Sequence, residues 1–578
     1  MMIHRTDLNI LAKARGPGGY MPTAVELLRQ GRNDDLWQMC CGYLKFDIQQ
    51  FMAVQKRLLL GQIEALNHSE IGRKIFNGAI IRTVEDFREQ VPLTDYSAYC
   101  PELVEKRDDS LPEKPLYWVH TSGRSGVFPC KWVPITPSYV TELSRILYGV
   151  GLLSSCKSYG DTSQLVERPK IMYTVAPRPY ISGAFASMLE KQTPSYYLPD
   201  LSEAEELPFE QRIKLGFKEA LSGGLDYFFG LSLVLAAVGT KFSQSSHHVE
   251  ILPLLSHPRS FINLTRAIIK SRLTGRKLMP KDIWNVRGIV TSGLDSFVYK
   301  EKIKEYWGRY PLDVYSNTEG GVIATQTWDY SSMTFIPNLN FLEFIPEREH
   351  FKWQMDKSYR PKTVLLDEVE AGGIYEIVIT NFNRGALVRY RVGDMIRITS
   401  LKNDNSGIKL PQMIFERRAD DLLDFALIRL SEKSIWQAIE NTRIPYNDWV
   451  AFKSPEELVL NVIIEANEEI SNKSEVQNIL YKQILKTDSE TYSSIKEQED
   501  LANMIKFKLN LILIPKGSFA NYTARKIAEG ADLAHLKPPH INPPADVLSS
   551  LLQDTTVAAV PTDKTIPESQ PSDRVPVA

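Results

Sequence analysis

Residues 117–126 read Tyr-Trp-Val-His-Thr-Ser-Gly-Arg-Ser-Gly, and Lys131 follows shortly after them. The stretch is an apolar strand end that runs into a loop of threonine, serine and glycine. Glycines let backbone N–H groups approach phosphate oxygens, hydroxyl groups donate hydrogen bonds, and a lysine adds positive charge. No G-x-x-x-x-G-K-[ST] pattern can be drawn here, so this is not a Walker loop. The stretch therefore predicts either a polyphosphate-binding loop or a simple surface turn.

Strand-like and helical patterns alternate on the C-terminal side of this loop, as far as about Ile398. The strand-like runs include RPKIMYTVA, VRGIVTSG, LDVYSNTEGG and IYEIVITNF. Strands rich in valine and isoleucine that alternate with helices indicate an α/β fold. The most apolar run, YFFGLSLVLAAVGT between Asp226 and Lys241, is shorter than the ~20 residues of a membrane span, so it predicts a buried helix. Helical spacing also extends from Asp47 to Phe76 on the N-terminal side.

The pattern changes at the charged segment FERRADDLLDF, which predicts a domain boundary. We expect a large α/β domain over residues 1–415, with mixed sheets flanked by helices, and a hinge over 416–424. A small, mobile α+β domain is expected over 425–541, because two strand-like runs flank a helical pattern there. Residues 546–578 are rich in proline and polar side chains and are expected to be a disordered tail.

Two further motifs place carboxylates beside strand ends. Residues 312–321 read LDVYSNTEGG, so that Glu319 follows a strand and precedes two glycines. Residues 385–394 read GALVRYRVGD and end on Asp394. A carboxylate in the first position suits a Mg²⁺ and phosphate contact, and one in the second suits the two hydroxyls of a ribose. Taken alone, the second motif could be an ordinary solvated turn and the third a hairpin turn with flanking salt bridges.

Composition excludes several classes of protein. The 578 residues carry 68 lysines and arginines against 70 acidic residues, so no basic surplus favours nucleic-acid binding. Five cysteines without a C-x-x-C spacing argue against a disulfide framework or a zinc site. The first residues contain no apolar core of a signal peptide. We expect a cytoplasmic protein with no membrane span, no nucleic-acid partner and no obligate protein partner.

Taken together and in this order, the three motifs resemble those of the adenylate-forming superfamily of firefly luciferase and acyl-CoA synthetases. ERRADD at residues 416–421 resembles the hinge of that superfamily. LNHSEIGRKIF, FREQVPLTDYSAYCPELVEK, RLSEKSIWQAIE and GADLAHLKPPHI resemble elements of the auxin-responsive acyl acid–amido synthetases and their bacterial relatives. The resemblance spans roughly residues 47–541.

This resemblance implies a role for each matching position. The β- and γ-phosphates of ATP would lie against one group of residues: Thr121, Ser122, Gly123, Ser125, Gly126 and Lys131. The second motif would contribute Tyr315 to the ATP site, Thr318 to the α-phosphate and Glu319 to Mg²⁺.

In the third motif, Asp394 would bind the ribose hydroxyls and Arg391 would support its turn. The mobile domain would bring a lysine to the α-phosphate, with Lys433 and Lys537 as the candidates for this catalytic role.

The implied function is an ATP-dependent ligase that adenylates a small carboxylic acid and transfers the acyl group to an amino acid, with ATP and Mg²⁺ required. An acyl-CoA synthetase, which would use CoA as the acceptor, is the alternative enzyme. A non-catalytic nucleotide- or acid-binding protein is the third possibility, because Arg124 stands where the family has a small hydroxylic residue.

Overall fold

The computed structural model describes residues 21–557 with the following gaps: 122–129, 245–268, 270–272, 274–276, 293–295, 420–421, 426–427, 455–457, 469, 471, 488–506, 529–537, 539 and 544.

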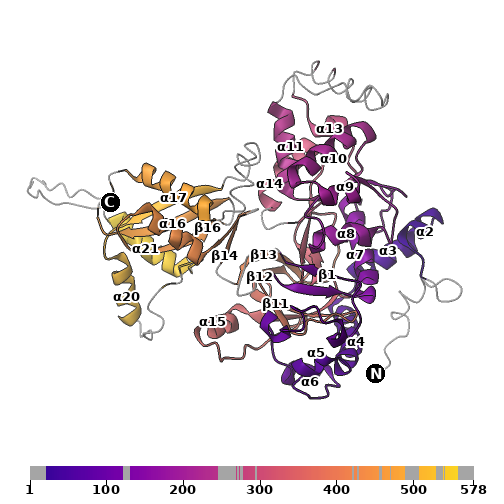
Figure 1. Ribbon diagram of the computed structural model, residues 1–578, viewed down its shortest axis with the longest axis horizontal. Coiled ribbons are helices and arrows are strands. Elements are labelled where there is room, and N and C mark those ends of the chain that lie inside the picture. Colours follow the sequence, from indigo (N-terminus) through magenta and orange to yellow (C-terminus); the bar gives the residue numbers. More distant parts are fainter. Residues whose placement is uncertain are drawn as a thin grey trace, which may run out of the picture. The chain divides into compact units, whose positions relative to one another are not determined.

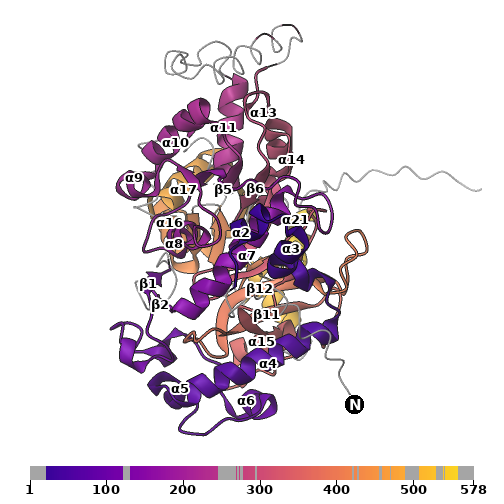
Figure 2. The same cartoon turned by 90° about the vertical axis from the view of Figure 1, so that its right-hand side faces the viewer.

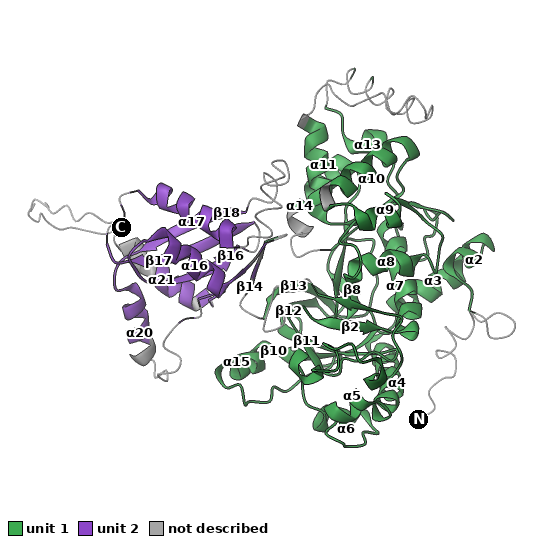
Figure 3. Cartoon of the chain, in the orientation of Figure 1, with its two compact units in different colours: residues 1–420, 424–427, 500–505 green, residues 421–423, 428–499, 506–578 purple. Residues whose placement is uncertain are grey.

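The chain divides into two compact units (Figure 3). Unit 1 contains residues 1–420, 424–427 and 500–505, and unit 2 contains residues 421–423, 428–499 and 506–578. The chain changes from one unit to the other at the short strand β14 (Leu422–Phe425), which pairs with β15 (Ile428–Ser431).

Unit 1 is built around one mixed sheet of eleven strands with the order β10-β11-β12-β13-β9-β8-β7-β6-β5-β3-β4. Its strands are β3 (Lys170–Thr174), β4 (Tyr196–Leu198), β5 (Tyr227–Gly230), β6 (Gly288–Thr291), β7 (Leu312–Asn317), β8 (Gly321–Thr325), β9 (Met333–Phe335), β10 (Asn340–Pro346), β11 (Ile374–Asn381), β12 (Tyr390–Ser400) and β13 (Gln412–Arg418). The four strand-like runs quoted from the sequence form β3, β6, β7 and β11, so the expected α/β class is confirmed.

Strand β7 is where the character of the sheet changes. β4, β3, β5, β6 and β7 run parallel to their neighbours, whereas β7 and β8 are antiparallel, as are all the pairs from β8 to β10. A separate antiparallel hairpin of β1 (Tyr117–His120) and β2 (Trp132–Ile135) carries the first motif, with Tyr117 opposite Ile135 and His120 opposite Trp132.

Helices of unit 1 cover this sheet in groups. They are α2 (Ala24–Arg29), α3 (Asn33–Cys41), α4 (Ile48–Asn67), α5 (Glu70–Ile75), α6 (Val84–Gln90), α7 (Pro137–Ser155), α8 (Ile181–Leu189), α9 (Leu201–Glu206), α10 (Phe209–Gly223), α11 (Ser232–Gln244), α13 (Pro280–Ile283), α14 (Ser296–Trp307) and α15 (Glu347–Met355). Figures 1 and 2 show α4, α5 and α6 lying together and α10, α11, α13 and α14 forming another group. α7 packs on β6, β7 and β8, and α4 packs on β10.

The long helix α4 is stabilised by a capping box at its start and by a buried apolar face. Asp47 and Gln50 make a reciprocal capping box at its start, with Gln50 N donating to Asp47 Oδ1 at 2.8 Å and Asp47 N donating to Gln50 Oε1 at 3.0 Å. Phe51, Leu59 and Leu66 on one face are fully buried. The helix expected over Asp47–Phe76 is thus present, although it is divided into α4 and α5.

The sequence predicts one buried helix for the apolar run between Asp226 and Lys241, but the structure differs. Its first residues form β5 at Tyr227–Gly230 and the remainder forms α11 from Ser232. Phe228 is fully buried between the flanking strands β3 and β6. Continuous apolarity is common to a parallel strand covered on both faces and to a buried helix, so periodicity alone does not separate them.

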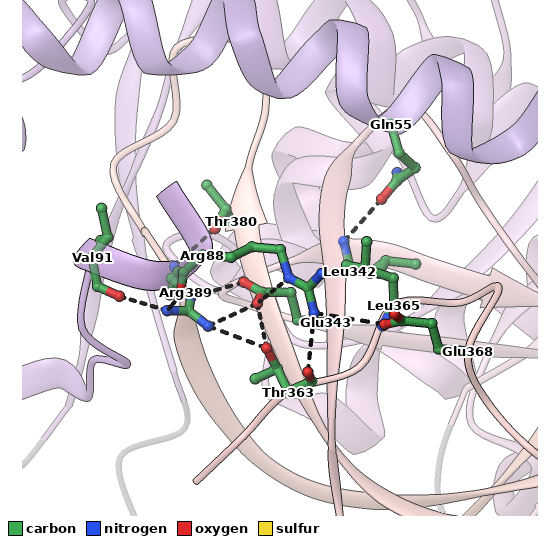
Figure 4. A network of polar contacts seen from close by, with 10 residues as sticks. All are labelled: Gln55, Arg88, Val91, Leu342, Glu343, Thr363, Leu365, Glu368, Thr380 and Arg389. Carbon is green, nitrogen blue, oxygen red and sulfur yellow. Dashed lines mark hydrogen bonds and ion pairs between the residues drawn. The ribbon is translucent and has the colours of Figure 1, made fainter. Parts of the chain in front are cut away.

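The strands of unit 1 are linked to α6 by a buried network of polar contacts (Figure 4). The guanidinium of Arg389 donates to both carboxylate oxygens of Glu343, at 3.0 and 2.8 Å, and also to the carbonyl oxygens of Arg88 and Val91 at 2.8 and 2.5 Å. Thr363 Oγ1 donates to Glu343 at 2.7 Å. Both charges of the ion pair are therefore buried and fully hydrogen-bonded.

Unit 2 has its own sheet and its own core. Its strands β16 (Tyr446–Lys453), β17 (Val459–Ala466) and β18 (Lys508–Ile514) are accompanied by helices α16 (Glu432–Thr442), α17 (Lys473–Thr487), α20 (Ser518–Ala528) and α21 (Ala545–Val557).

The expected disordered tail over 546–578 is wrong at its beginning. Helix α21 spans Ala545–Val557, and its Val547 and Leu551 are buried in a cluster with Val450, Ile463 and Phe519. The leucines and valine of ADVLSSLLQ supply an apolar face that the proline-rich composition farther along conceals. Residues 558–578 lie outside the described part of the chain.

The large unit also extends past the expected boundary at Phe415. Gln412–Arg418 form β13, which pairs with β12 from Gln412 opposite Ser400 to Arg418 opposite Asp394, and unit 1 reaches residue 420. The first residues of the expected hinge, 416–418, are therefore part of the sheet. Their charged side chains resemble a linker in the sequence, but their backbone is held by strand pairing.

Candidate active site

The second motif lies at the carboxyl end of β7, where the parallel half of the sheet meets the antiparallel half. Tyr315 is in the strand, and Thr318 and Glu319 are in the turn to β8. Carboxyl ends of strands at such a change of direction are common ligand sites in α/β proteins. Glu319 is only 8% exposed, so its carboxylate is withheld from bulk water.

The third motif places Asp394 against this strand end. Tyr315 donates its hydroxyl hydrogen to Asp394 Oδ2 at 2.6 Å, and Arg418 donates to Asp394 Oδ1 at 2.6 Å. Asp394 is 4% exposed. Burial, and next to it the charge of Asp394, raises the pKa of Tyr315 well above its ordinary value, so the phenol stays a proton donor.

Glu319 belongs to a second cluster formed with Tyr390 and Lys131. Lys131 Nζ donates to the hydroxyl of Tyr390 at 3.0 Å and lies 3.6 Å from Glu319 Oε1. The Tyr390 hydroxyl in turn donates to the same Glu319 oxygen at 3.3 Å. Burial followed by the Glu319 charge raises the pKa of Tyr390 well above its ordinary value. The cluster thus surrounds one carboxylate with a cation and a permanent donor.

These contacts require a strongly curved sheet. Three strands, β8, β9 and β13, separate β7 from β12 in the sheet order. Four steps between neighbouring strands would place β7 and β12 about 19 Å apart in a flat sheet. The hydrogen bonds of Tyr315 to Asp394 and of Tyr390 to Glu319 show that the antiparallel half curls until these strands face each other.

The first motif is only partly described. Thr121 and Lys131 close the base of the β1–β2 hairpin: Thr121 N donates to the carbonyl oxygen of Lys131 at 3.1 Å, and Lys131 N donates to Thr121 Oγ1 at 3.2 Å. The other predicted phosphate-loop residues, Ser122, Gly123, Ser125 and Gly126, lie outside the described residues, as does Arg124. Lys131 of the first motif therefore contacts Glu319 of the second motif and Tyr390 of the third.

Arg391 contacts Glu376 and Trp353, and its expected role in supporting the turn of Asp394 stays a prediction. Its guanidinium makes a two-pronged ion pair with Glu376 at 2.9 and 2.6 Å and lies 3.6 Å above the ring of Trp353. Burial raises the pKa of Glu376, but hydrogen bonds from His350 and Arg391 outweigh it and lower that pKa below its ordinary value. Strand residues alternate between faces, so Arg391 cannot be assumed to share the surroundings of Asp394.

Arg418, which the sequence did not assign to the site, is an arginine that contacts Asp394. It stands directly opposite Asp394 in the β12–β13 register. Its position in ERRADD was attributed to the hinge, and no spacing rule links it to Asp394 in the sequence. Tyr390 was also missed as a site residue, although it lies inside the quoted third motif; a tyrosine flanked by two arginines gives no signal of which side chain faces the site.

The two candidate catalytic lysines belong to unit 2. Lys433 is exposed on α16, in the first turn after Ser431 caps the helix by accepting a hydrogen bond from Ser434 N at 3.1 Å. Lys537 lies outside the described residues. The role of either lysine remains a prediction.

The donor set fits a magnesium ion that arrives with a nucleotide. Within the described residues, no group of three or more histidine, cysteine, aspartate or glutamate side chains could hold a metal by itself. Mg²⁺ is usually held by one or two carboxylates together with substrate phosphates. The ammonium of Lys131, 3.6 Å from Glu319, marks this carboxylate as a position that favours positive charge.

Fold and site together define an α/β protein with a carboxylate-lined candidate site at the end of β7. Two family models match it: the GH3 family N-terminal domain at residues 43–178 and the GH3 family central domain at residues 333–418. Two segments of the chain are thus similar to domains of the GH3 family, in agreement with the resemblance drawn from its motifs.

Curated relatives match over part of their length. The jasmonoyl–L-amino acid synthetase JAR4 of Nicotiana attenuata is 31% identical over 172 residues, which are 28% of this chain and 27% of that protein. The indole-3-acetic acid-amido synthetase GH3.17 of Arabidopsis thaliana is 30% identical over 187 residues, which are 29% of each chain. The chain thus spans less than a third of the length of these relatives.

Among solved structures, the AtGH3.15 acyl acid amido synthetase in complex with 2,4-DB aligns with 89% of this chain and 95% of its own, with a TM-score of 0.49 and 15% identity. In the stretches of residues 21–557 that are described, we find no helix long and apolar enough to cross a membrane.

Proposed function

We propose that this protein is an ATP-dependent ligase that joins a small carboxylic acid to an amino acid through an acyl-adenylate. The observation that carries the proposal is the buried carboxylate of Asp394, held at 2.6 Å by both Tyr315 and Arg418, within a chain that has two segments similar to GH3 family domains. A carboxylate fixed in this way has the geometry to accept both hydroxyls of a ribose.

In the first half-reaction, an oxygen of the substrate carboxylate attacks the α-phosphorus of ATP. The bond from that phosphorus to the bridging oxygen of pyrophosphate breaks, and acyl-AMP and pyrophosphate form. The protein contributes positioning and charge neutralisation rather than covalent chemistry. Asp394 orients the ribose, Lys131 turns from Glu319 to the phosphates, and Thr318 contacts the α-phosphate.

Glu319 would hold Mg²⁺, which when bound neutralises negative charge on the phosphates. Before it binds, Lys131 offsets the charge of Glu319 at 3.6 Å. With Mg²⁺ at Glu319, Lys131 would be available to the phosphates, where it would supply a positive charge.

In the second half-reaction, the neutral amine of an amino acid attacks the acyl carbon, and the carbon–oxygen bond to AMP breaks. The amine loses a proton, and an amide and AMP are the products. Lys433 or Lys537 would serve the first half-reaction from the mobile unit, at the α-phosphate.

The test is acid-dependent exchange of radiolabelled pyrophosphate into ATP, screened over small aromatic and aliphatic acids, followed by mass spectrometry of the product with amino acids or CoA. We expect exchange with at least one acid, AMP formation accelerated by amino acids, and an amide. An acyl-thioester with CoA and no amide with any amino acid would instead identify an acyl-CoA synthetase. Bound ATP without exchange for any acid would contradict both enzymes, and activity gained by Arg124→Thr would then identify Arg124 as the cause.

A further inference from the structure

Two asparagines lie directly opposite each other on neighbouring strands beside the candidate site. Asn340 begins β10 and Asn381 ends β11, and they are partners in the antiparallel register. They are 1% and 3% exposed. Asn381 Nδ2 donates to Asn340 Oδ1 at 2.9 Å, and Asn381 Oδ1 accepts from Leu387 N at 3.1 Å.

The remaining donors of this pair hold the backbone of the Glu319 turn. Asn381 Nδ2 also donates to the carbonyl oxygen of Glu319 at 2.9 Å, and Asn340 Nδ2 donates to the carbonyl oxygen of Gly320 at 2.7 Å. On the other side of the turn, Asn317 Oδ1 accepts from Gly320 N at 2.6 Å. Both peptide groups that follow Glu319 are therefore fixed by buried amide side chains.

This contact joins opposite ends of the antiparallel half of the sheet. β7 and β10 are six steps apart in the strand order, which would be about 29 Å in a flat sheet. The asparagine pair bridges the turn after β7 to β10 and β11, and so determines where the curled sheet meets itself. The direction of the Glu319 side chain depends on this closure.

The Glu319 turn and the asparagine pair are closely packed against neighbouring residues at two glycines. Gly321 has a φ of +63°, and a Cβ there would lie 2.3 Å from the Tyr139 hydroxyl oxygen. A Cβ on Gly385 would lie 2.4 Å from the Cβ of Asn381. Gly385 is the first residue of the third motif. Because it has no side chain, Asn381 has room to hold the Glu319 turn of the second motif.

Helix α4 holds the strand ends that carry the pair. Gln55 Nε2 donates to the carbonyl oxygen of Asn340 at 2.8 Å, and Gln55 Oε1 accepts from Leu342 N at 2.9 Å. Gln62 makes the same two kinds of contact with Gly385 O at 2.8 Å and Arg384 N at 2.9 Å. Two buried amides on one helix thus order the backbone on either side of the asparagines.

We propose that Asn340 and Asn381 are positioning residues for the divalent-cation site: by holding the carbonyl oxygens of Glu319 and Gly320, they aim the Glu319 carboxylate at the metal. The inference rests on the proposed function in its use of Glu319 as the metal ligand. Outer-shell partners of this kind influence metal affinity without touching the metal.

The test uses Asn381→Asp and Asn340→Asp in the full chain. Each variant keeps the shape of the asparagine side chain and its acceptor oxygen but replaces the NH2 donor with an oxygen. A carboxyl group then faces the carbonyl oxygen of Glu319 or Gly320. Mn²⁺ binding is measured by electron paramagnetic resonance in the presence of α,β-methylene-ATP, without acid, so that no turnover is needed. Calorimetric melting is recorded for every variant.

Asn461→Asp is the matched control. Asn461 is also a buried member of a cross-strand asparagine pair, accepting from Asn510 Nδ2 at 2.9 Å and donating to Ser454 Oγ at 2.9 Å, but it belongs to β17 of unit 2. Its substitution should alter melting and leave Mn²⁺ affinity unchanged.

We expect the two variants to bind Mn²⁺ about 10- to 100-fold more weakly than the parent. Mn²⁺ affinities within twofold of the parent in either folded variant would overturn the proposal, as would absence of Mn²⁺ binding by the parent.

The two proposals fail separately. Asparagine-dependent Mn²⁺ binding in a parent protein that exchanges pyrophosphate with no acid would support the positioning role and reject the ligase. Exchange by the parent, with unchanged Mn²⁺ affinity in the variants, would do the reverse.

Discussion

Asp394 is held by one neutral and one charged donor, and the two are separable by substitution. Tyr315→Phe removes the hydroxyl hydrogen bond of 2.6 Å and leaves the Arg418 pair in place. We expect about a 10- to 150-fold loss of ATP affinity in isothermal titration calorimetry, because a hydrogen bond to a charged group contributes about 1.5–3 kcal/mol. Asp394→Ala should lose considerably more, because two ribose hydroxyls are left without an acceptor.

Tyr197→Phe is the control for this substitution. Tyr197 is also a buried tyrosine, but its hydroxyl donates to the carbonyl oxygen of Ala186 at 2.9 Å and not to Asp394. It should lower stability without changing ATP affinity. If Tyr315→Phe and Asp394→Ala both bind ATP like the parent, the third motif is only a turn.

The buried ion pair of Arg389 and Glu343 makes a different prediction at the residue scale. Arg389→Leu would deprive Glu343, whose side chain is 1% exposed, of its two-pronged cation and leave Arg88 at 3.9 Å as a more distant one. Removing one partner of a buried pair destabilises a protein by about 3–5 kcal/mol. We expect a lower free energy of unfolding of that size in denaturant titrations, and a smaller loss in the double variant Arg389→Leu/Glu343→Gln.

Arg29→Ala provides the exposed comparison. Arg29 pairs with Glu167 at 2.8 Å, but their side chains are 46% and 55% exposed. Such pairs contribute about 0–1 kcal/mol. Equal losses from Arg29→Ala and Arg389→Leu would show that burial does not decide the strength of these pairs here.

At the scale of elements, His540 connects the C-terminal segment of unit 2 to α16 and β16. Its Nδ1 lies 2.6 Å from Glu432 Oε1 and its Nε2 lies 2.8 Å from Asp448 Oδ1, while its ring stacks on Trp449. The hydrogen bond with Asp448, opposed by burial and assisted by Glu432, raises the pKa of His540 above 6.5. The protonated ring is thus the form that the folded unit prefers.

This raised pKa predicts the direction of a pH effect. A group whose pKa is higher in the folded state stabilises that state fully below its unfolded pKa, and the stabilisation is lost as pH rises through the folded pKa. Unit 2 should therefore melt at a lower temperature at about pH 8 than at about pH 6, by calorimetry. His540→Gln should remove most of this dependence; an equal dependence in the variant would place its origin elsewhere.

At the scale of the whole molecule, two separate cores predict two separable melting transitions. Leu551 is fully buried in the core of unit 2, and Leu143 is fully buried in that of unit 1. Leucine-to-alanine changes in a core lower the free energy of unfolding by about 2–5 kcal/mol. In scanning calorimetry, Leu551→Ala should lower one transition and Leu143→Ala the other.

The two variants control each other in this experiment. A single transition that both substitutions shift equally would show that the units unfold together. A stable Leu551→Ala protein would show that α21 contributes nothing to the core of unit 2, as the composition of the C-terminal region had led us to expect.

The sequence by itself was sufficient for the fold class, for four strands of the large sheet and for the family resemblance. β3, β6, β7 and β11 coincide with apolar β-branched runs, because burial between layers requires such residues whatever the neighbouring strands are. The order of the three motifs was sufficient for the family resemblance because each motif is a local stretch of chain. Local information is what a linear sequence contains.

Tertiary structure alone decided which charged groups meet. Arg418, not Arg391, reaches Asp394, because strand register and alternation determine which face a side chain occupies. Asn340 and Asn381 reach the Glu319 turn because the sheet curls over the seven strands from β7 to β10. Register, curvature and long-range contact depend on the packing of the whole unit, and no spacing along the chain records them.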